Sequence, residues 1–596
     1  MSTDSQNEAR DFDATFGWRL GFAVLLALLT AAVYANAAHG VFINDDKFLV
    51  VKSVSLSPDA ILKMFRENAW AASGVSSDLY RPMLTLLLAI EGHLHGGGER
   101  WFHLTNIALH IATTLLLYRL LALLLGDAFA ALLPAFLAAL IFGVHPIHTE
   151  AVDSVFNRSE ILATLGVLGA MWVVLRWGAS HPASAWLGAS VIYLFALLCR
   201  ESAAPLPALV LLVLVFHRPE LLRTAAGRRR LWPALSMLAV AAVYLLLRRV
   251  ALTPTPESLA ALQALGKSAS PTGAKLALPA SGQVFLMHLG MALCFLREGL
   301  RLLIFPHPLH AIYHSLGAGG PGHALAMHVL ILGSALLCWR SAPGFLLGLS
   351  FFYLALLPST RILMGNVSVA LAERYLYLPS VGLSLALALL LRSWTAERGK
   401  WLAPALLGLG LGAVVVVFGG LTIQRNAEWS SEIALWQAEA RVAPESADSW
   451  QRLASTYLEA NRKSEASDIC DQQLSRHLAA AKLQTVCAVV YDNLGRMRDA
   501  EAAYKQAVQL KLGAAAHANL ARFYDRMGRR QEAERAYQEA VRTEVNPAHQ
   551  HYRRAQYLLR FYPERQDEAR LELQRALEIQ PRFMAASTAL RGLSQP

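Results

Sequence analysis

The amino-acid sequence predicts an all-α protein with two bodies, a polytopic membrane bundle followed by a tetratricopeptide-like repeat superhelix. The chain of 596 residues is 55% hydrophobic and only 16% charged, which is too apolar for a soluble protein of this size. Apolar runs fill residues 19–423, whereas residues 424–596 are rich in charge and alanine. Aromatic and alanine positions in this second part recur at a fixed spacing, which is typical of helical repeats.

A membrane-spanning helix takes about 20 apolar residues, and about eleven segments of the chain approach this length. The predicted spans are 19–38, 101–125, 127–143, 157–177, 184–199, 203–217, 232–248, 323–340, 343–358, 375–392 and 401–423. Residues 281–305 are also apolar but carry Arg297, Glu298 and Arg301, so we predict an interfacial or re-entrant helix there, on the outer side. Eleven crossings would place the two termini on opposite sides of the membrane.

Short basic loops decide the orientation, because the cytoplasmic loops of membrane proteins are enriched in lysine and arginine. The runs 217–232 and 392–400 are short and basic, and we predict that both face the cytoplasm. Residues 1–18 then form a cytoplasmic tail, and the first span is retained rather than cleaved as a signal peptide. The repeat domain and the polar motifs at the span ends consequently share the outer side.

Two adjacent carboxylates, Asp45 and Asp46, follow the first span in the run Val-Phe-Ile-Asn-Asp-Asp. Adjacent carboxylates disfavour double ionisation, so one of the two is suited to proton transfer. We expect Asp45 to take a proton from an acceptor hydroxyl, and Asp46 to position the acceptor or to raise the pKa of its neighbour. The sequence alone does not distinguish the two roles.

Other charged and imidazole side chains gather at the ends of later spans. Arginine offers a bidentate fork to a lipid phosphate, and histidine offers an N–H donor. The candidates for binding a donor phosphate or substrate are Arg81, His103, His145, His148, Glu150, Arg158, Glu160, Arg200, Glu201 and Arg374. A structural ion pair at a helix end would explain Arg200-Glu201 or Glu373-Arg374 equally well. Hydrogen bonds that hold helix ends together would explain one or two of the residues between His145 and Glu160, but less easily all of them.

Two of these motifs allow further predictions. His145, His148 and Glu150 offer three ligands to a metal, but no other spacing in the chain supports zinc, and we expect no metal site. His103 shares one face of an otherwise apolar helix with Asn106 and His110, so this polar face should point into the protein.

The C-terminal part repeats on itself every 33 or 34 residues. The recurring positions include Tyr457, Tyr491 and Tyr524, and also Ala466, Ala500 and Ala533. The pattern Trp450-x-x-Leu453-Ala454-x-x-Tyr457 matches the first helix of a tetratricopeptide unit. We expect about four repeats over residues 424–596, with a concave groove that binds an extended peptide or another protein. Cys470 and Cys487 can form a disulfide if this domain faces an oxidising compartment.

With these residues in this order, the chain resembles the transmembrane and tetratricopeptide-repeat O-mannosyltransferases, a family of the GT-C glycosyltransferase superfamily. The resemblance is carried by Phe42–Asp46, Tyr80-Arg81-Pro82, His103–His110, His145–Glu150, Arg158-Ser159-Glu160, Arg200-Glu201, Glu373–Ser380 and the trailing repeats. The acidic pair of the family maps onto Asp45 and Asp46. Arg200-Glu201 stands where relatives often show Lys-Glu, and the repeat array is shorter than in the animal members.

The resemblance implies an inverting transfer of mannose or another hexose from a polyprenyl-phosphate sugar to Ser or Thr hydroxyls of an exported protein, with no required cofactor. The expected partners are this donor, membrane lipids and an acceptor protein in the repeat groove, without nucleic acid. The composition indicates a bacterial inner membrane, with the active site and the repeats on the periplasmic side. Two alternatives stay open: the same enzyme type acting on a lipid or polysaccharide, with the repeats recruiting partner proteins, and a transporter or flippase. Polar clusters at the span ends, rather than at mid-membrane depth, disfavour the transporter.

Overall fold

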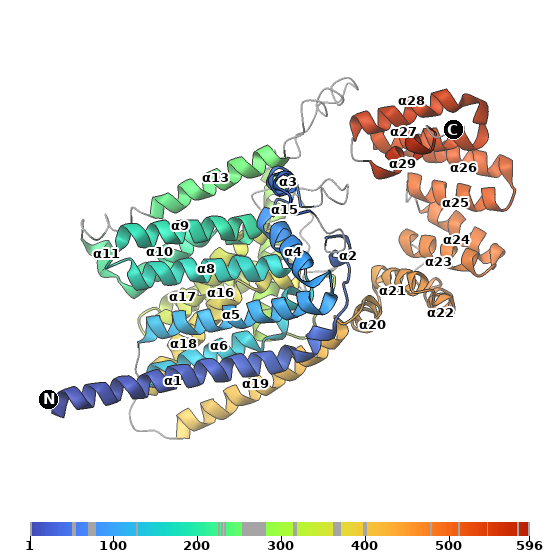
Figure 1. The fold of residues 1–596 in the computed structure, drawn as a ribbon. Helices are drawn as coiled ribbons and strands as arrows, with labels where there is room; N and C mark the ends of the chain where they lie inside the picture. The colour runs from blue at the N-terminus through green and yellow to red at the C-terminus, as the bar shows by residue number, and fades with distance from the viewer. Residues whose placement is uncertain are drawn as a thin grey trace. The chain divides into compact units, whose positions relative to one another are not determined.

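The computed structural model shows an all-helical chain that divides into two compact units (Figure 1). The first unit contains α1 to α19 and the second contains α20 to α29, with the division between Ser431 and Glu432. No β-strand occurs in the part of the chain that the structure describes. The described residues are 3–49, 55–69, 79–126, 129–224, 227, 231, 234–252, 282–313, 319–360, 371–396, 402–476, 480–510, 513–544, 546–580 and 583–593. Parts of the two basic loops used for orientation, 225–226, 228–230, 232 and 397–400, lie outside them.

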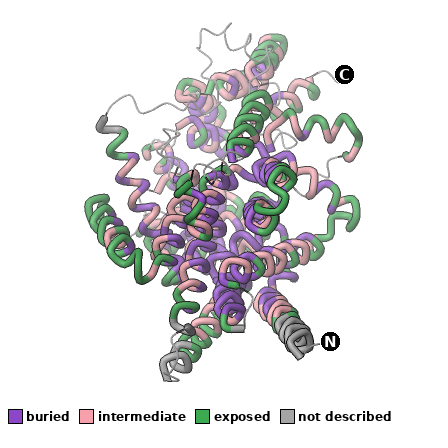
Figure 2. Tube along the Cα trace, turned by 90° about the vertical axis from the view of Figure 1, so that its left-hand side faces the viewer, coloured by how far each residue is buried: buried purple, intermediate pink, exposed green. Residues whose placement is uncertain are grey.

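Long apolar helices joined by short 3-10 turns form the first unit. Its helices are α1 (Thr3–Tyr34), α2 (Asp46–Leu49), α3 (Pro58–Arg66), α4 (Pro82–His95), α5 (Glu99–Leu125), α6 (Phe129–Gly143), α7 (Thr149–Asp153), α8 (Arg158–Trp177), α9 (Pro182–Cys199), α10 (Leu206–His217), α11 (Glu220–Arg223), α13 (Ala234–Leu252), α15 (Gly282–Ile304), α16 (Pro321–Leu337), α17 (Pro343–Leu356), α18 (Ser380–Ala396) and α19 (Leu402–Glu428). The 3-10 helices are η1 (Ala35–His39), η3 (Pro146–His148), η4 (Glu201–Ala203), η5 (Leu357–Thr360) and η6 (Glu373–Leu376). Buried residues face one another inside the helical layers, and exposed residues lie on the outward faces (Figure 2).

The predicted membrane bundle is confirmed, but fewer of its helices reach the length of a full span than expected. Among the described residues, 8 helices are long and apolar enough to cross a membrane, and the bent pair Ala130–Gly143 and Pro146–Asp153 makes up to 9. The other two predicted spans are α10, with 12 residues, and α16, with 17 residues. Of the eleven predicted spans, these two therefore stay shorter than a full span, because both helices end in loops before they reach that length. The predicted interfacial segment, α15, is not among the candidate spans.

The first and last helices of this unit run parallel. Gly419 of α19 packs near Val33, Asn36 donates to the carbonyl oxygen of Ile423 at 2.9 Å, and Val41 N–H donates to Ser430 at 3.2 Å. Residue numbers increase together along this contact, so both helices end at the same end of the bundle. Parallel first and last helices require an odd number of crossings between them. The loop with Asp45 and Asp46 and the exit toward the second unit thus lie on one side.

Helix pairs with short connections form the second unit. Its helices are α20 (Glu432–Val442), α21 (Ala447–Glu459), α22 (Lys463–Gln473), α23 (Ala481–Asn493), α24 (Met497–Gln509), α25 (Ala514–Arg526), α26 (Arg530–Thr543), α27 (Pro547–Phe561), η7 (Pro563–Arg565), α28 (Gln566–Ile579) and α29 (Met584–Gly592). Each of the pairs α21–α22, α23–α24, α25–α26 and α27–α28 is one repeat. Alanine at the crossings lets the two helices of a repeat approach closely, as at Ala466, Ala500 and Ala533, which are fully buried.

The recurring tyrosines connect each repeat to the preceding one. Tyr491 donates a hydrogen bond to Asp471 at 2.8 Å, and Tyr524 donates to Glu501 at 3.2 Å. An arginine five residues after each tyrosine lies over its ring and pairs with the same acid. A disulfide between Cys470 and Cys487 adds a covalent link between the first two repeats, α21–α22 and α23–α24. The spacing of 33 or 34 residues therefore reflects a repeated contact between helix pairs.

Candidate functional site

The acidic pair lies in a turn at the end of the first long helix. Phe42 N–H donates to Glu99 at 3.1 Å, which ties the turn to the start of α5. Asn44 has a positive φ of 47°, a conformation that asparagine tolerates better than most residues. Beyond it, Asp45 is exposed to solvent, whereas Asp46 is fully buried. The two neighbours therefore occupy opposite environments.

The buried Asp46 carboxylate accepts three hydrogen bonds from the loop between α7 and α8. Ser154 Oγ donates at 3.2 Å, Val155 N–H at 3.1 Å and Phe156 N–H at 2.7 Å. Burial raises the pKa of Asp46 from 3.8 to about 6, and these three hydrogen bonds oppose the rise. Both carboxylate oxygens are thus occupied in holding this loop.

The polar face predicted on α5 points inward. Asn106 donates to the carbonyl oxygens of Val152 and Ser154 at 2.8 and 3.1 Å, so it holds the loop that Asp46 also binds. His110 lies within 2.7 Å of the Tyr377 hydroxyl. His103 is buried as well, and neither of its ring nitrogens has a hydrogen-bond partner in the described part of the chain.

All three guanidinium nitrogen atoms of Arg158 have partners inside the protein. Its guanidinium group donates to Asn106 Oδ1 at 2.5 Å and to the Phe102 carbonyl oxygen at 2.8 Å, and it pairs with the Glu91 carboxylate. The side chain is 2% exposed. These contacts favour a structural role in which Arg158 joins α8 to α4 and α5.

Three other predicted arginines gather with their acidic partners in a second cluster. Arg81 donates to Glu201 at 3.2 Å, Arg200 pairs with Glu160 at 2.8 Å, and Arg374 pairs with Glu150. The guanidinium carbons of Arg200 and Arg374 lie 5.7 and 5.0 Å from the centre of the Tyr375 ring. We call Arg81, Arg200 and Arg374 the arginine cluster.

The arginine cluster retains unused hydrogen-bonding capacity at Arg81. This side chain is 3% exposed, yet its Nε and Nη1 groups have no hydrogen-bond partner in the described part of the chain. A buried unpaired donor costs roughly 1–3 kcal/mol. Burial lowers the pKa of Arg200, and the positive charge of Arg81 acts in the same direction. The cluster therefore suits an anionic ligand.

Phe156 connects the arginine cluster to the acidic pair. Its N–H group donates to Asp46, and its aromatic ring lies 5.2 Å from the Arg81 guanidinium carbon. One residue of the loop before α8 therefore contacts both the Asp46 carboxylate, through its N–H group, and the Arg81 guanidinium group, through its ring.

The histidine motif has a different environment from the one expected for a phosphate site. His145 lies 3.0 Å from the Leu303 carbonyl oxygen and accepts from Ile147 N–H at 3.2 Å. His148 lies 2.9 Å from the Phe142 carbonyl oxygen and 3.0 Å from Ser380 Oγ. All four ring nitrogens have partners within the protein. Among the described residues, no three His, Cys, Asp or Glu side chains are grouped as metal ligands would be.

The sequence did not predict two buried acids at the site. Glu91 pairs with Arg158, and Asp153 is 3% exposed with no hydrogen-bond partner for either carboxylate oxygen in the described part of the chain. A signal existed for Asp153, because it follows Glu150 by three residues and so continues the acidic side of the same short helix. No local signal marked Phe156, and Tyr375 was included only as part of the Glu373–Ser380 motif, without a role of its own.

Comparisons with known proteins match both units of the chain. Two family models described as tetratricopeptide repeat match residues 482–512 and 516–550, which cover the repeats α23–α24 and α25–α26. Over 524 residues, the chain is 24% identical to the protein O-mannosyl-transferase TMTC3 of Mus musculus. Over 523 residues, it is 26% identical to TMTC2 of the same organism. These alignments cover 82% and 74% of this chain.

The curated relatives of this chain are protein O-mannosyl-transferases. TMTC1 of Homo sapiens is 35% identical over 150 residues, which is 24% of this chain and 17% of the relative. The resemblance to this family, inferred from the ordered motifs, is thereby confirmed. The chain spans about half the length of the relatives it matches over most of its own length, 54% for TMTC3 and 60% for TMTC2.

The raised pKa of Asp46 predicts a pH-dependent stability. The folded protein keeps the Asp46 proton up to about pH 6, whereas the unfolded chain releases it near the ordinary value of 3.8. This proton stabilises the fold fully below about pH 4, and we expect its contribution, roughly 3 kcal/mol, to be lost as the pH rises to about 6. The Tm difference between wild type and Asp46→Asn, measured by differential scanning fluorimetry in detergent, should change over this range and then level off. Asp59→Asn, at an exposed acid in α3, is the control, and a difference that is constant with pH would contradict the prediction.

Proposed function

We propose that this chain is an inverting GT-C glycosyltransferase of the membrane. It transfers mannose or another hexose from a polyprenyl-phosphate donor to Ser or Thr hydroxyls of exported proteins. The names of its relatives support protein O-mannosyl transfer. The observation that carries the proposal is the link through Phe156, which holds the acidic pair beside the arginine cluster. A transferase that uses a lipid phosphate needs a base and a cationic site in this close arrangement.

In this reaction Asp45 acts as the general base. The acceptor oxygen bonds to the anomeric carbon as the bond from this carbon to the phosphate oxygen breaks, and Asp45 receives the hydroxyl proton. Asp45 suits this role because it is exposed, whereas both oxygens of Asp46 accept hydrogen bonds from the loop before α8. Asp46 then acts as the positioning residue.

The arginine cluster receives the leaving phosphate. Negative charge grows on the phosphate as the sugar departs, and prearranged cations stabilise such charge in the transition state. The Nε and Nη1 groups of Arg81 have no acceptor among the residues that the structure describes, and Arg374 remains partly exposed at 29%. Glu150, Glu160 and Glu201 hold the arginines in place through ion pairs. Arg158, His145 and His148 already have partners within the protein and support the framework instead.

We also propose that the active site and the repeats work on the periplasmic side of a bacterial inner membrane. The parallel α1 and α19 end on the same side, so the chain leaves the membrane bundle on the side of Asp45. The disulfide between Cys470 and Cys487 supports an oxidising compartment for the repeats. Tetratricopeptide repeats support protein binding, and we assign them to docking the acceptor protein.

Replacing Asp45 by Asn removes the proposed base. We expect the rate of sugar transfer to fall by roughly 10²- to 10⁴-fold, with donor binding nearly unchanged, because the side chain keeps its size. Mass spectrometry of exported proteins from cells that express each variant would measure hexose on Ser and Thr. Asp59→Asn should transfer normally. Full transfer by both Asp45→Asn and Asp46→Asn would refute the mechanism, and hexose found on a lipid or polysaccharide instead would favour the alternative acceptor.

Replacing Arg81 by Lys keeps the charge but loses the planar fork of donors. We expect the KM for a polyprenyl-phosphate mannose donor to rise by roughly tenfold, with a smaller change in kcat. The same replacement at Arg340, an exposed arginine after α16, is the matched control. An unchanged donor KM for Arg81→Lys would remove Arg81 from the phosphate site.

Sidedness has a separate test. Alkaline phosphatase fused to the C-terminus should be active, because this enzyme requires an oxidising compartment for its own disulfides. In the same cells, Cys470 and Cys487 should react with a maleimide only after reduction and denaturation. An inactive fusion together with freely reactive thiols would place the repeats in the cytoplasm.

A further inference from the structure

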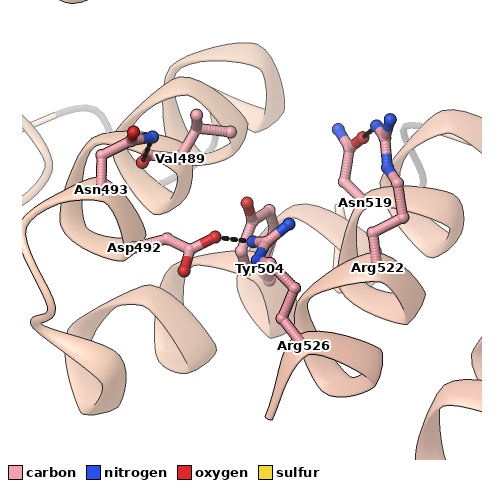
Figure 3. Close-up of a pocket in the computed structure, with 7 residues that line it drawn as sticks. All are labelled: Val489, Asp492, Asn493, Tyr504, Asn519, Arg522 and Arg526. Carbon is pink, nitrogen blue, oxygen red and sulfur yellow. Dashed lines mark hydrogen bonds and ion pairs between the residues drawn. The ribbon is translucent and has the colours of Figure 1, made fainter.

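A cavity of about 470 Å³ lies between two neighbouring repeats of the C-terminal unit (Figure 3). It is lined by residues from α23, α24 and α25: Val489, Asp492, Asn493, Tyr504, Asn519, Arg522 and Arg526. The transfer chemistry proposed above uses none of them. Five of the seven carry polar or charged side chains other than tyrosine, so the cavity suits a polar ligand.

Tyr504 is the buried member of this lining, with 3% exposure. Its hydroxyl group has no hydrogen-bond partner in the described part of the chain, although it borders the cavity. The tyrosines that join successive repeats behave differently, because Tyr491 and Tyr524 each donate to an acid of the preceding repeat. The Tyr504 hydroxyl is therefore available to a ligand.

Of the two arginines that line the cavity, Arg522 has no carboxylate partner among the described residues. Arg526 pairs with Asp492, whereas the hydrogen bond of Arg522 goes to the side-chain oxygen of Asn519 (Figure 3). Arg522 and Tyr504 line the same cavity from neighbouring repeats, and the charge of Arg522 opposes the rise to about 12 that burial causes in the pKa of Tyr504. The cavity lining contains two arginines and one aspartate, so its net charge is positive by one unit.

We propose that this cavity binds an Asp or Glu side chain of the acceptor protein, presented by an extended segment that carries the target Ser or Thr. Arg522 pairs with the carboxylate, and the Tyr504 hydroxyl donates a hydrogen bond to it. Asn493 and Asn519 line the same cavity from adjacent repeats, and amide side chains can both donate to and accept from a peptide main chain. This inference rests on the proposed function, because it assigns the repeats to acceptor docking and adds which acceptors they select.

Peptide binding to the full-length protein in detergent tests the subsite. A library of Ser-centred peptides with one flanking position randomised at a time is captured on wild type without donor and sequenced. We expect enrichment of Asp and Glu at one position. An acidic peptide from this pool should bind Arg522→Ala at least roughly tenfold more weakly than wild type. The matched peptide with Asn or Gln should bind both proteins equally.

Two further variants separate the subsite from damage to the fold. Tyr504→Phe keeps the ring and should weaken the acidic peptide severalfold, whereas Arg498→Ala, at an exposed arginine of α24 outside the cavity, should bind like wild type. No acidic preference in wild type, or an unchanged preference in Arg522→Ala, would overturn the inference.

Transfer measured on the same peptides with a polyprenyl-phosphate mannose donor tests the proposed function separately. Acidic preference without transfer would support the subsite and count against the enzyme.

Discussion

The contact on which the rest of the site depends is the buried Asp46 carboxylate and the three donors that surround it. An ionised carboxylate inside a protein is costly unless it is hydrogen-bonded, and the loop before α8 supplies two N–H groups and one hydroxyl. In return, Asp46 fixes the position of that loop, and Asn106 holds it from the other side. The exposed position of Asp45 and the support of Arg81 by Phe156 both follow from this arrangement.

The arginines at the span ends are of two kinds. Arg158 is completely paired, and it holds three helices together by hydrogen bonds and one ion pair. The arginine cluster is instead held by glutamates, and within the described ranges the Nε and Nη1 donors of Arg81 have no partner. Buried ion pairs contribute little net stability, because desolvation offsets their attraction. In the proposed reaction, these ion pairs hold fixed positive charge in position for the leaving phosphate.

Sequence reasoning succeeded where the signal was local and periodic. The inward polar face of α5 and the repeat of 33 or 34 residues both follow from helix geometry, and both are confirmed. The sequence predicted the lengths of the spans less well, because the helices α10 and α16 end before they reach the length of a full span. It also placed Arg158, His145 and His148 in the same candidate set as the arginine cluster, and residue type alone does not reveal that these three side chains have partners within the protein.

The sequence by itself determined the two-part helical architecture, the presence of the acidic pair and the family resemblance. These depend on hydropathy, spacing and residue order, which are properties of short stretches. Only the tertiary structure distinguished Asp45 from Asp46, and it alone brought Phe156 to Asp46 across 110 residues and Arg374 to Glu150 across 224 residues. Such long-range partners are set by the packing of whole helices, and this packing decides which polar groups are consumed by the fold and which remain for a ligand.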